Sequence, residues 1–215
     1  MANFDVVEVS TDFLIIGGGM SSCGVAVEAA YWAKKHNVKI TLVDKAAVDR
    51  SGAVAMGLSA INQYVDLRSG NNTIKDYVEY VRTDLMGVTR EDLVANIARH
   101  VDSLEKKKKK WGLPIWKDEE SNYVHEGRWQ LMINGDSYKV IVAEAAKNAL
   151  GIDNIYERVF IVEPLMDGDK VSGAVGFSVR ENKFYIFKAK AVYIGAGGAV
   201  HVFKPRSTGE GLGRA

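Results

Sequence analysis

The organisation of this chain follows from one stretch near its N-terminus, Asp12-Phe-Leu-Ile-Ile-Gly-Gly-Gly-Met-Ser-Ser-Cys-Gly-Val-Ala-Val-Glu-Ala-Ala30. An apolar run up to Ile16 predicts a buried strand, and the small residues after Met20 predict a helix. A strand, a glycine turn and a helix in this order form the context in which a dinucleotide-binding fingerprint carries meaning. Gly17 permits the tight turn. Gly19 lets the backbone approach a pyrophosphate at the positive end of the helix.

The strand that follows supports dinucleotide binding more than the glycines alone do. Val38-Lys-Ile-Thr-Leu-Val-Asp44 is short and apolar, and it ends in an acid where a ribose-binding carboxylate is expected. An acid there disfavours a 2′-phosphate, so FAD or NAD is favoured over NADP. Ser22 stands at the third glycine position of the fingerprint, and it is small enough for close packing. The alternative is a glycine-rich turn that binds no ligand.

The composition is that of an ordinary globular protein. Of the 215 residues 47% are hydrophobic and 26% charged, and the net charge of +1 gives no electrostatic case for nucleic acid. No run approaches the ~18 apolar residues of a membrane span, and the N-terminus has no secretory signal. We therefore expect a cytoplasmic protein. The single cysteine, Cys23, excludes an internal disulfide or an iron–sulfur or zinc site made by this stretch alone, and we interpret it as a packing residue.

The remaining chain predicts a mixture of helices and strands. A glycine- and alanine-rich segment over 45–63 is either a second cofactor loop or a tight helix-packing segment. Later elements are helices over 73–85 and 89–104 (with Thr73 and Thr89 as N-caps), a hairpin over 123–133, a helix over 138–150, a strand over 154–162, a hairpin of 170–179 with 183–189, and a second apolar strand over 191–199 that ends in glycines.

Several other functions find no support in these residues. The five lysines 106–110 continue the helix that starts at 89, and without interleaved aromatic residues they indicate a solvated helix end rather than a nucleic-acid site. The four histidines are dispersed and show no metal-ligand spacing, so we expect no metal site. Neither a Gly-x-Ser-x-Gly elbow nor a Walker loop occurs, which leaves hydrolase and NTPase functions unsupported.

These elements together resemble the two-dinucleotide-type FAD-binding fold. That fold is an α/β, Rossmann-like domain with a parallel sheet and an antiparallel hairpin insertion, whose last strand returns with glycines such as Gly195-Ala-Gly-Gly198. The segment 50–62 resembles the flavin-contacting loop of fumarate reductase and succinate dehydrogenase flavoproteins. Members that bind flavin covalently carry a histidine there. None lies between Asp44 and Thr73, so we expect noncovalent FAD.

Within that superfamily, five blocks resemble the α subunits of dissimilatory adenylylsulfate reductases. They are Gly57-Leu-Ser-Ala-Ile-Asn62, Lys110-Trp-Gly-Leu-Pro-Ile-Trp116, Glu126-Gly-Arg-Trp-Gln130, Gly135-Asp-Ser-Tyr-Lys139 and Phe203-Lys-Pro-Arg-Ser-Thr-Gly-Glu-Gly-Leu-Gly-Arg214. The resemblance covers essentially all of the chain, and the lysine run before Trp111 is a departure from it. It implies an FAD-binding domain over 1–215 that is incomplete at its C-terminus, with a helical and hairpin insertion at about 64–137. Capping and C-terminal domains would be absent, and the substrate-gripping residues would lie beyond residue 215.

The resemblance implies an FAD-dependent enzyme that reversibly reduces adenylylsulfate to AMP and sulfite in dissimilatory sulfur metabolism. Electrons would come from an iron–sulfur β subunit, so the clusters would lie only on that partner. The implied cofactor-binding residues are Gly17, Gly18, Gly19, Met20, Ser21, Asp44, Lys45, Ser51, Gly52, Gly57, Ser59, Phe160, Ala196, Gly197, Gly198 and Thr208.

Asn62 is the candidate catalytic residue, because its amide could donate a hydrogen bond to a substrate oxygen near the flavin. The alternative is an asparagine that caps or turns the backbone after Ile61. Two other functions stay open. One is a sibling FAD oxidoreductase of the fumarate reductase, succinate dehydrogenase or aspartate oxidase type, acting on C4 dicarboxylates. The other is an FAD-binding module without activity.

Overall fold

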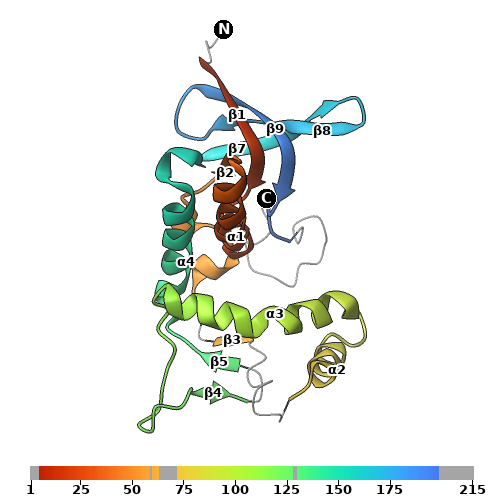
Figure 1. Ribbon diagram of the computed structural model, residues 1–215, viewed down its shortest axis with the longest axis vertical. Helices are drawn as coiled ribbons and strands as arrows, with labels where there is room; N and C mark the ends of the chain where they lie inside the picture. Colours follow the sequence, from red (N-terminus) through yellow and green to blue (C-terminus); the bar gives the residue numbers. More distant parts are fainter. Residues whose placement is uncertain (1–4, 59, 63–71, 128–129, 199–215) are drawn as a thin grey trace. The chain divides into compact units, whose positions relative to one another are not determined.

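The computed structural model describes residues 5–58, 60–62, 72–127 and 130–198 (Figure 1). The chain divides into two compact units, and the boundaries fall after Gly57 and after Tyr138. Unit 1 consists of Met1–Gly57 and Lys139–Ala215, and unit 2 consists of Leu58–Tyr138. Each unit is described by itself.

Unit 1 is built on a six-stranded sheet with the order β6-β2-β1-β9-β8-β7 (Figure 1). Its strands are β1 (Asp5–Ile16), β2 (Ile40–Asp44), β6 (Ile155–Glu157), β7 (Val159–Asp167), β8 (Lys170–Ser178) and β9 (Lys183–Ile194). Strands β6, β2, β1 and β9 run parallel, whereas β7, β8 and β9 pair antiparallel. The predicted α/β class, with a parallel sheet and an antiparallel hairpin, is therefore confirmed.

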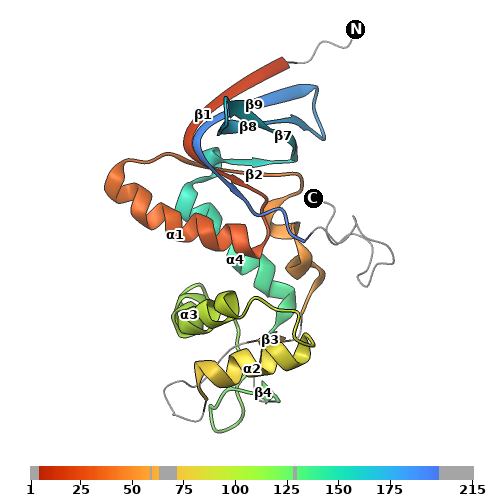
Figure 2. The same ribbon diagram turned by 90° about the vertical axis from the view of Figure 1, so that its right-hand side faces the viewer.

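The centre of the parallel sheet is buried, which explains its continuous apolar sequence. All five residues of β2 are buried, and the side chains Leu14, Ile15, Leu42 and Val43 have no exposed surface. Helix α1 (Met20–His36) has buried small residues, including Ala26 and Ala30. Helix α4 (Gly135–Leu150) lies beside α1 in both views (Figure 1, Figure 2). The glycine turn between β1 and α1 therefore lies next to closely packed strands and helices.

Aromatic side chains fill the core where the parallel strands meet the antiparallel strands. Phe187 on β9 has no exposed surface, and its ring centroid lies 5.3 Å from that of Tyr156 and 5.8 Å from that of Tyr185. Burying an aromatic side chain of this size contributes roughly 1.5–3 kcal/mol. Phe187 also packs in one buried cluster with Val9 and Leu14 of β1, and β1 pairs with β9 up to Ile194, just before the glycines that follow β9.

Two strand boundaries differ from the sequence prediction. The predicted strand over 154–162 is split into β6 and β7 at Arg158, whose φ of 63° interrupts the extended backbone. The strands predicted over 183–189 and 191–199 are one continuous strand, β9, which ends at Ile194. It stays continuous because it pairs with β1 along both segments.

Unit 2 contains two helices and a small antiparallel sheet with the order β3-β5-β4. Its elements are α2 (Ile74–Asp84), α3 (Glu91–Lys110), β3 (Ala60–Asn62), β4 (His125–Glu126) and β5 (Gln130–Met132). Tyr77, Ala98 and Val101 are buried together between the helices. The two predicted helices and the predicted hairpin are confirmed, and α3 continues through the lysine run as expected.

The start of α2 is the one predicted from sequence. The hydroxyl of Thr73 accepts a hydrogen bond from the Asp76 N–H at 3.2 Å, and the Asp76 carboxylate accepts one from the Thr73 N–H at 2.8 Å. This reciprocal pair is a capping box, which satisfies two N–H groups that the helix itself leaves without a partner.

The starts of α3 and α4 differ from the prediction. Thr89 does not cap α3, which begins at Glu91, and the Arg90 guanidinium binds the Asp92 carboxylate at 2.9 and 2.7 Å. Helix α4 begins at Gly135 rather than Tyr138. The side-chain oxygen of Asn134 accepts from the N–H of Asp136 at 3.2 Å, which caps the helix earlier than expected.

The segment 45–63 forms short turns in its described part, and no α-helix. These are the 3₁₀ turns η1 (Val48–Arg50) and η2 (Ala53–Met56), followed by β3. A third turn, η3 (Ile152–Asn154), precedes β6. None of the helices in the described ranges combines the length and the apolar character that crossing a membrane requires.

Candidate functional site

The glycine turn lies where the carboxyl ends of β1 and β9 meet. The Gly17 N–H donates to the Val43 carbonyl, and the Gly195 N–H donates to the Ile16 carbonyl, both at 2.8 Å. Gly17 has a φ of 100°, and a Cβ added to it would collide with the Gly195 carbonyl oxygen. Only glycine fits this position. The structure therefore brings together Gly17 and the glycine segment after β9, as predicted.

Asp44 lies directly beside this turn at the end of β2. It is 5% exposed, and a Cβ added to Gly18 would lie 2.6 Å from its Oδ2 atom. Burial raises the pKa of Asp44, while hydrogen bonds from Ser51 and from the backbone of Ala46 and Lys45 lower that pKa. Oδ2 itself is buried without a hydrogen-bond partner among the described residues. A buried carboxylate oxygen in that state costs free energy unless a donor reaches it.

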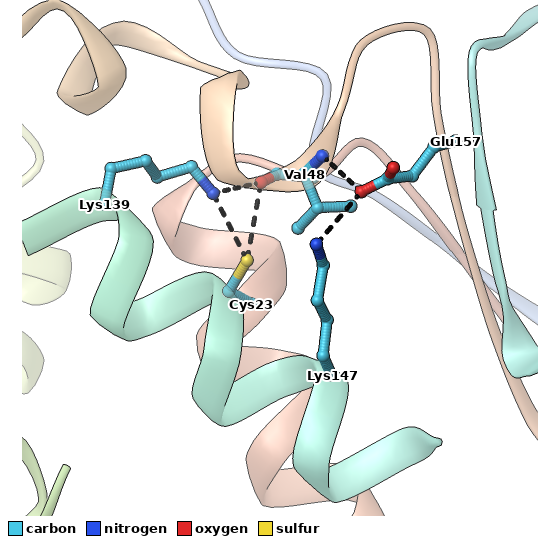
Figure 3. Close-up of polar contacts among 6 residues, drawn as sticks. Cys23, Val48, Lys139, Lys147 and Glu157 are labelled. Atoms are coloured by element: carbon cyan, nitrogen blue, oxygen red, sulfur yellow. Dashed lines mark hydrogen bonds and ion pairs between the residues drawn. The ribbon is translucent and has the colours of Figure 1, made fainter. Parts of the chain in front are cut away.

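The loop after β2 packs against the glycine turn. A Cβ added to Gly52 would come within 3.1 Å of the Gly19 Cα, so the two backbones approach closely. Within this loop the Val48 N–H donates to Glu157 Oε1 at 2.8 Å. The Lys147 ammonium lies 3.4 Å from the same oxygen (Figure 3). Strand β6 therefore holds the loop through the bond from Val48 to Glu157, and Lys147 pairs with that carboxylate rather than with the loop.

Two further predicted residues open α1. Met20 is 42% exposed, and the Ser21 hydroxyl hydrogen-bonds to the Tyr193 hydroxyl at 2.8 Å. The first backbone hydrogen bond of the helix runs from the Cys23 N–H to the Gly19 carbonyl, so the N–H groups before it lie at the open end. Such an end, with its positive dipole, is a favourable place for phosphate oxygens.

The other predicted residues lie elsewhere in unit 1, in unit 2 or outside the described part. The Lys45 ammonium lies 5.8 Å from the centroid of the Phe160 ring on β7. Gly57 follows η2, and residues 196–198 follow β9. Ser59 and Thr208 lie outside the described residues. For Asn62 only the backbone is described, as the last residue of β3 and the partner of Gln130.

The residues present fit a dinucleotide. The turn offers backbone N–H groups and no side chain in its path, and Asp44 offers an unpartnered acceptor for a hydroxyl donor. The described residues contain no cluster of histidine, cysteine and carboxylate side chains that could hold a metal ion.

One residue of this region was not singled out from the sequence. Lys139 on α4 is only 2% exposed, and its ammonium donates to the Gly18 carbonyl at 2.6 Å. A signal for it does exist in the sequence, because Lys139 is four residues before the buried Ala143 and so shares its helix face. A lysine on the apolar side of a helix is unusual unless it has a partner.

Comparisons with known proteins identify close relatives, although no family model matches the chain. The adenylylsulfate reductase subunit alpha of Megalodesulfovibrio gigas is 53% identical over 98% of this chain and 35% of the relative. The solved adenylylsulfate reductase of Archaeoglobus fulgidus is 61% identical, with a TM-score of 0.87 over 99% of this chain and 34% of that one. A solved adenosine-5-phosphosulfate reductase in complex with sulfite, as a covalent adduct, gives the same values.

A more distant structure shares only the fold. Quinol fumarate reductase of E. coli is 21% identical, with a TM-score of 0.68 over 91% of this chain and 34% of that one. The expected flavoprotein fold, and the resemblance to adenylylsulfate reductase α subunits, are therefore confirmed. The chain spans about a third of the length of these relatives.

Proposed function

We propose that this chain is the flavin-binding portion of an adenylylsulfate reductase α subunit, an enzyme that reversibly reduces adenylylsulfate to AMP and sulfite. The observation that supports this most strongly is that the likeness to adenylylsulfate reductases runs over nearly the whole chain. A solved relative with sulfite as a covalent adduct favours sulfur chemistry over C4 dicarboxylate chemistry.

FAD is the proposed cofactor, bound noncovalently between the glycine turn and the loop after β2. Gly17–Gly19 and the first turn of α1 would bind the pyrophosphate, and Asp44 would accept from a ribose hydroxyl. When bound, the flavin supplies the two electrons that take sulfur from the sulfate to the sulfite oxidation state. Lys45, Ser51 and the segment after β9 would complete the binding surface.

Asn62 is proposed to orient the substrate. Its amide N–H would donate to a substrate oxygen, and such a donor contributes most where negative charge develops during the reaction. Its place at the end of β3, paired with Gln130, gives the residue a defined backbone position. The residues that grip the substrate more fully are expected in the part of the relatives that this chain does not span.

An iron–sulfur β subunit is the proposed electron donor. Cys23 is the single cysteine of the chain and is buried, so it offers no ligand set for a cluster. We further propose that the protein works in the cytoplasm, in dissimilatory sulfur metabolism, and binds no nucleic acid.

A single-turnover experiment tests the substrate class. The full-length protein with reduced flavin is mixed anaerobically with adenylylsulfate or with fumarate, and reoxidation is followed by the flavin absorbance. We expect reoxidation by adenylylsulfate alone, with sulfite and AMP formed in equal amounts. Reoxidation by fumarate would favour the sibling flavoproteins. Flavin that neither compound reoxidises would favour a binding module without activity.

A further inference from the structure

Lys139 is a buried cation with no ion-pair contact among the described residues, although its charge also acts on the nearby Asp44 carboxylate. Its ammonium donates to the Gly18 carbonyl at 2.6 Å and to the Cys23 sulfur at 3.5 Å (Figure 3). Among the described residues, no carboxylate lies within ion-pair distance of it. Removing an ammonium from water is costly, and one carbonyl and one thiol compensate for only part of that cost. The described protein groups therefore compensate the ammonium charge only in part, because the Asp44 carboxylate interacts with it without an ion-pair contact.

Lys147, two turns further along the same helix, shows the ordinary arrangement. Its ammonium lies 3.4 Å from a Glu157 carboxylate oxygen, and its side chain is 25% exposed (Figure 3). The two lysines of α4 thus differ in both pairing and burial. Lys147 connects α4 to the end of β6, whereas Lys139 reaches the backbone of the glycine turn. They form a natural pair of test and control positions.

The contact with Lys139 determines how the glycine turn presents its N–H groups. In a trans, planar peptide the carbonyl oxygen and the N–H of the next residue point in opposite directions. Because the Gly18 carbonyl points toward Lys139, the N–H of Gly19 points away from it. Gly19 is the N-cap of α1, with extended backbone angles of −66° and 177°. Its N–H therefore lies among the free donors at the open end of the helix.

We propose that Lys139 is a positioning residue for the FAD pyrophosphate. It holds the Gly18–Gly19 peptide with its N–H outward, and its charge offsets the phosphate charge from behind the turn. The inference rests on the proposed FAD site, and it adds a residue that does not touch the cofactor. Lys139 acts through Gly18, and the Cys23 thiol, which donates to the same carbonyl at 3.4 Å, fills the space beside the ammonium.

The test compares Lys139→Met with Lys147→Met in the full-length protein after removal of its flavin. Three quantities are measured: the Kd for FAD, the Kd for ADP from competition with FAD, and the urea midpoint of the apo-protein. For Lys139→Met we expect Kd to rise at least tenfold for both ligands, with a urea midpoint near that of the wild type. For Lys147→Met we expect both Kd values to stay within about twofold of the wild type.

Several outcomes would overturn the inference. An unchanged FAD Kd in Lys139→Met, or a loss for FAD without a matching loss for ADP, would remove Lys139 from the pyrophosphate site. A loss of affinity that merely follows a lowered urea midpoint would make it a residue of the fold. If Lys139→Met does not fold, Lys139→Gln is measured in the same way. Failure of both to fold also contradicts the inference, whereas a wild-type chain that binds no FAD contradicts the proposed function instead.

Discussion

Replacing Asp44 by alanine is expected to remove one charge-assisted hydrogen bond from bound FAD. Ser51 and the backbone of Ala46 and Lys45 already hydrogen-bond to the carboxylate, whereas Oδ2 has no partner among the described residues. One ribose hydroxyl that donates to this oxygen would contribute about 1.5–3 kcal/mol. In affinity this is roughly a ten- to hundredfold increase in the Kd for FAD.

The assay is a titration of the flavin-free, full-length protein with FAD, followed by flavin fluorescence. Thr41→Val is the matched control, because Thr41 lies on the same strand, is fully buried, and has a side-chain oxygen that also lacks a partner in the described part of the chain. This near-isosteric change should leave the Kd within about twofold of the wild type. An unchanged Kd in Asp44→Ala, or an equal loss in Thr41→Val, would refute the assignment of Asp44 to the ribose.

The pH dependence separates ribose binding from a purely structural role of Asp44. Burial raises the pKa of this carboxyl above its ordinary value of 3.8, and a donated hydroxyl would lower it again in the complex. Between the pKa of Asp44 in the complex and its higher pKa in the apo-protein, FAD binding should therefore release a proton. The affinity for FAD then increases with pH up to the pKa of the apo-protein and is constant above it. Asp44→Asn should lack this dependence. In the apo-protein the folded state binds the proton of Asp44 more tightly than the unfolded state does. The contribution of Asp44 to the free energy of unfolding therefore falls as pH rises from the ordinary pKa of 3.8 through the raised pKa of the folded state.

Three further predictions concern the same site. Gly18→Ala should lower the flavin content at least tenfold, measured by absorbance after purification, because the added Cβ would lie 2.6 Å from Asp44 Oδ2. A normal flavin content would show that the backbone of the turn can shift to accommodate the methyl group. Acid precipitation of the holoprotein should leave the yellow colour in the supernatant, since no histidine lies between Asp44 and Thr73, and a yellow pellet would mean covalent flavin. Asn62→Ala should lower kcat/KM by roughly 10²–10³ at normal flavin content. Wild-type kinetics in fully loaded Asn62→Ala enzyme would exclude Asn62 from the site.

The parts of the site that depend on local sequence were predictable. The turn at Gly17, the buried strand ending in Asp44 and the return of glycines after β9 each follow from residues within a few positions of one another. The capping box at Thr73 is local in the same way. Such features need only a strand or helix period and the conformational freedom of glycine, both of which the sequence displays directly.

The parts that depend on tertiary contacts were not predictable from the sequence. Thr89 and Asp92 match a capping pattern, but the Arg90 guanidinium binds Asp92 and the helix starts later. The break at Arg158 requires a positive φ that nothing in its neighbours signals. Lys139 appears in a helix of ordinary composition, and its meaning emerges only when Gly18, more than a hundred residues earlier, is placed beside it.

The most direct test of the proposed function is turnover by the full-length protein co-expressed with the product of its neighbouring gene. Sulfite and AMP are quantified after adding adenylylsulfate and an artificial electron donor, with fumarate as the competing substrate in a parallel assay. The proposed function predicts equal amounts of sulfite and AMP, formed only when FAD and adenylylsulfate are both present. Succinate formed from fumarate, with no sulfite from adenylylsulfate, would contradict it.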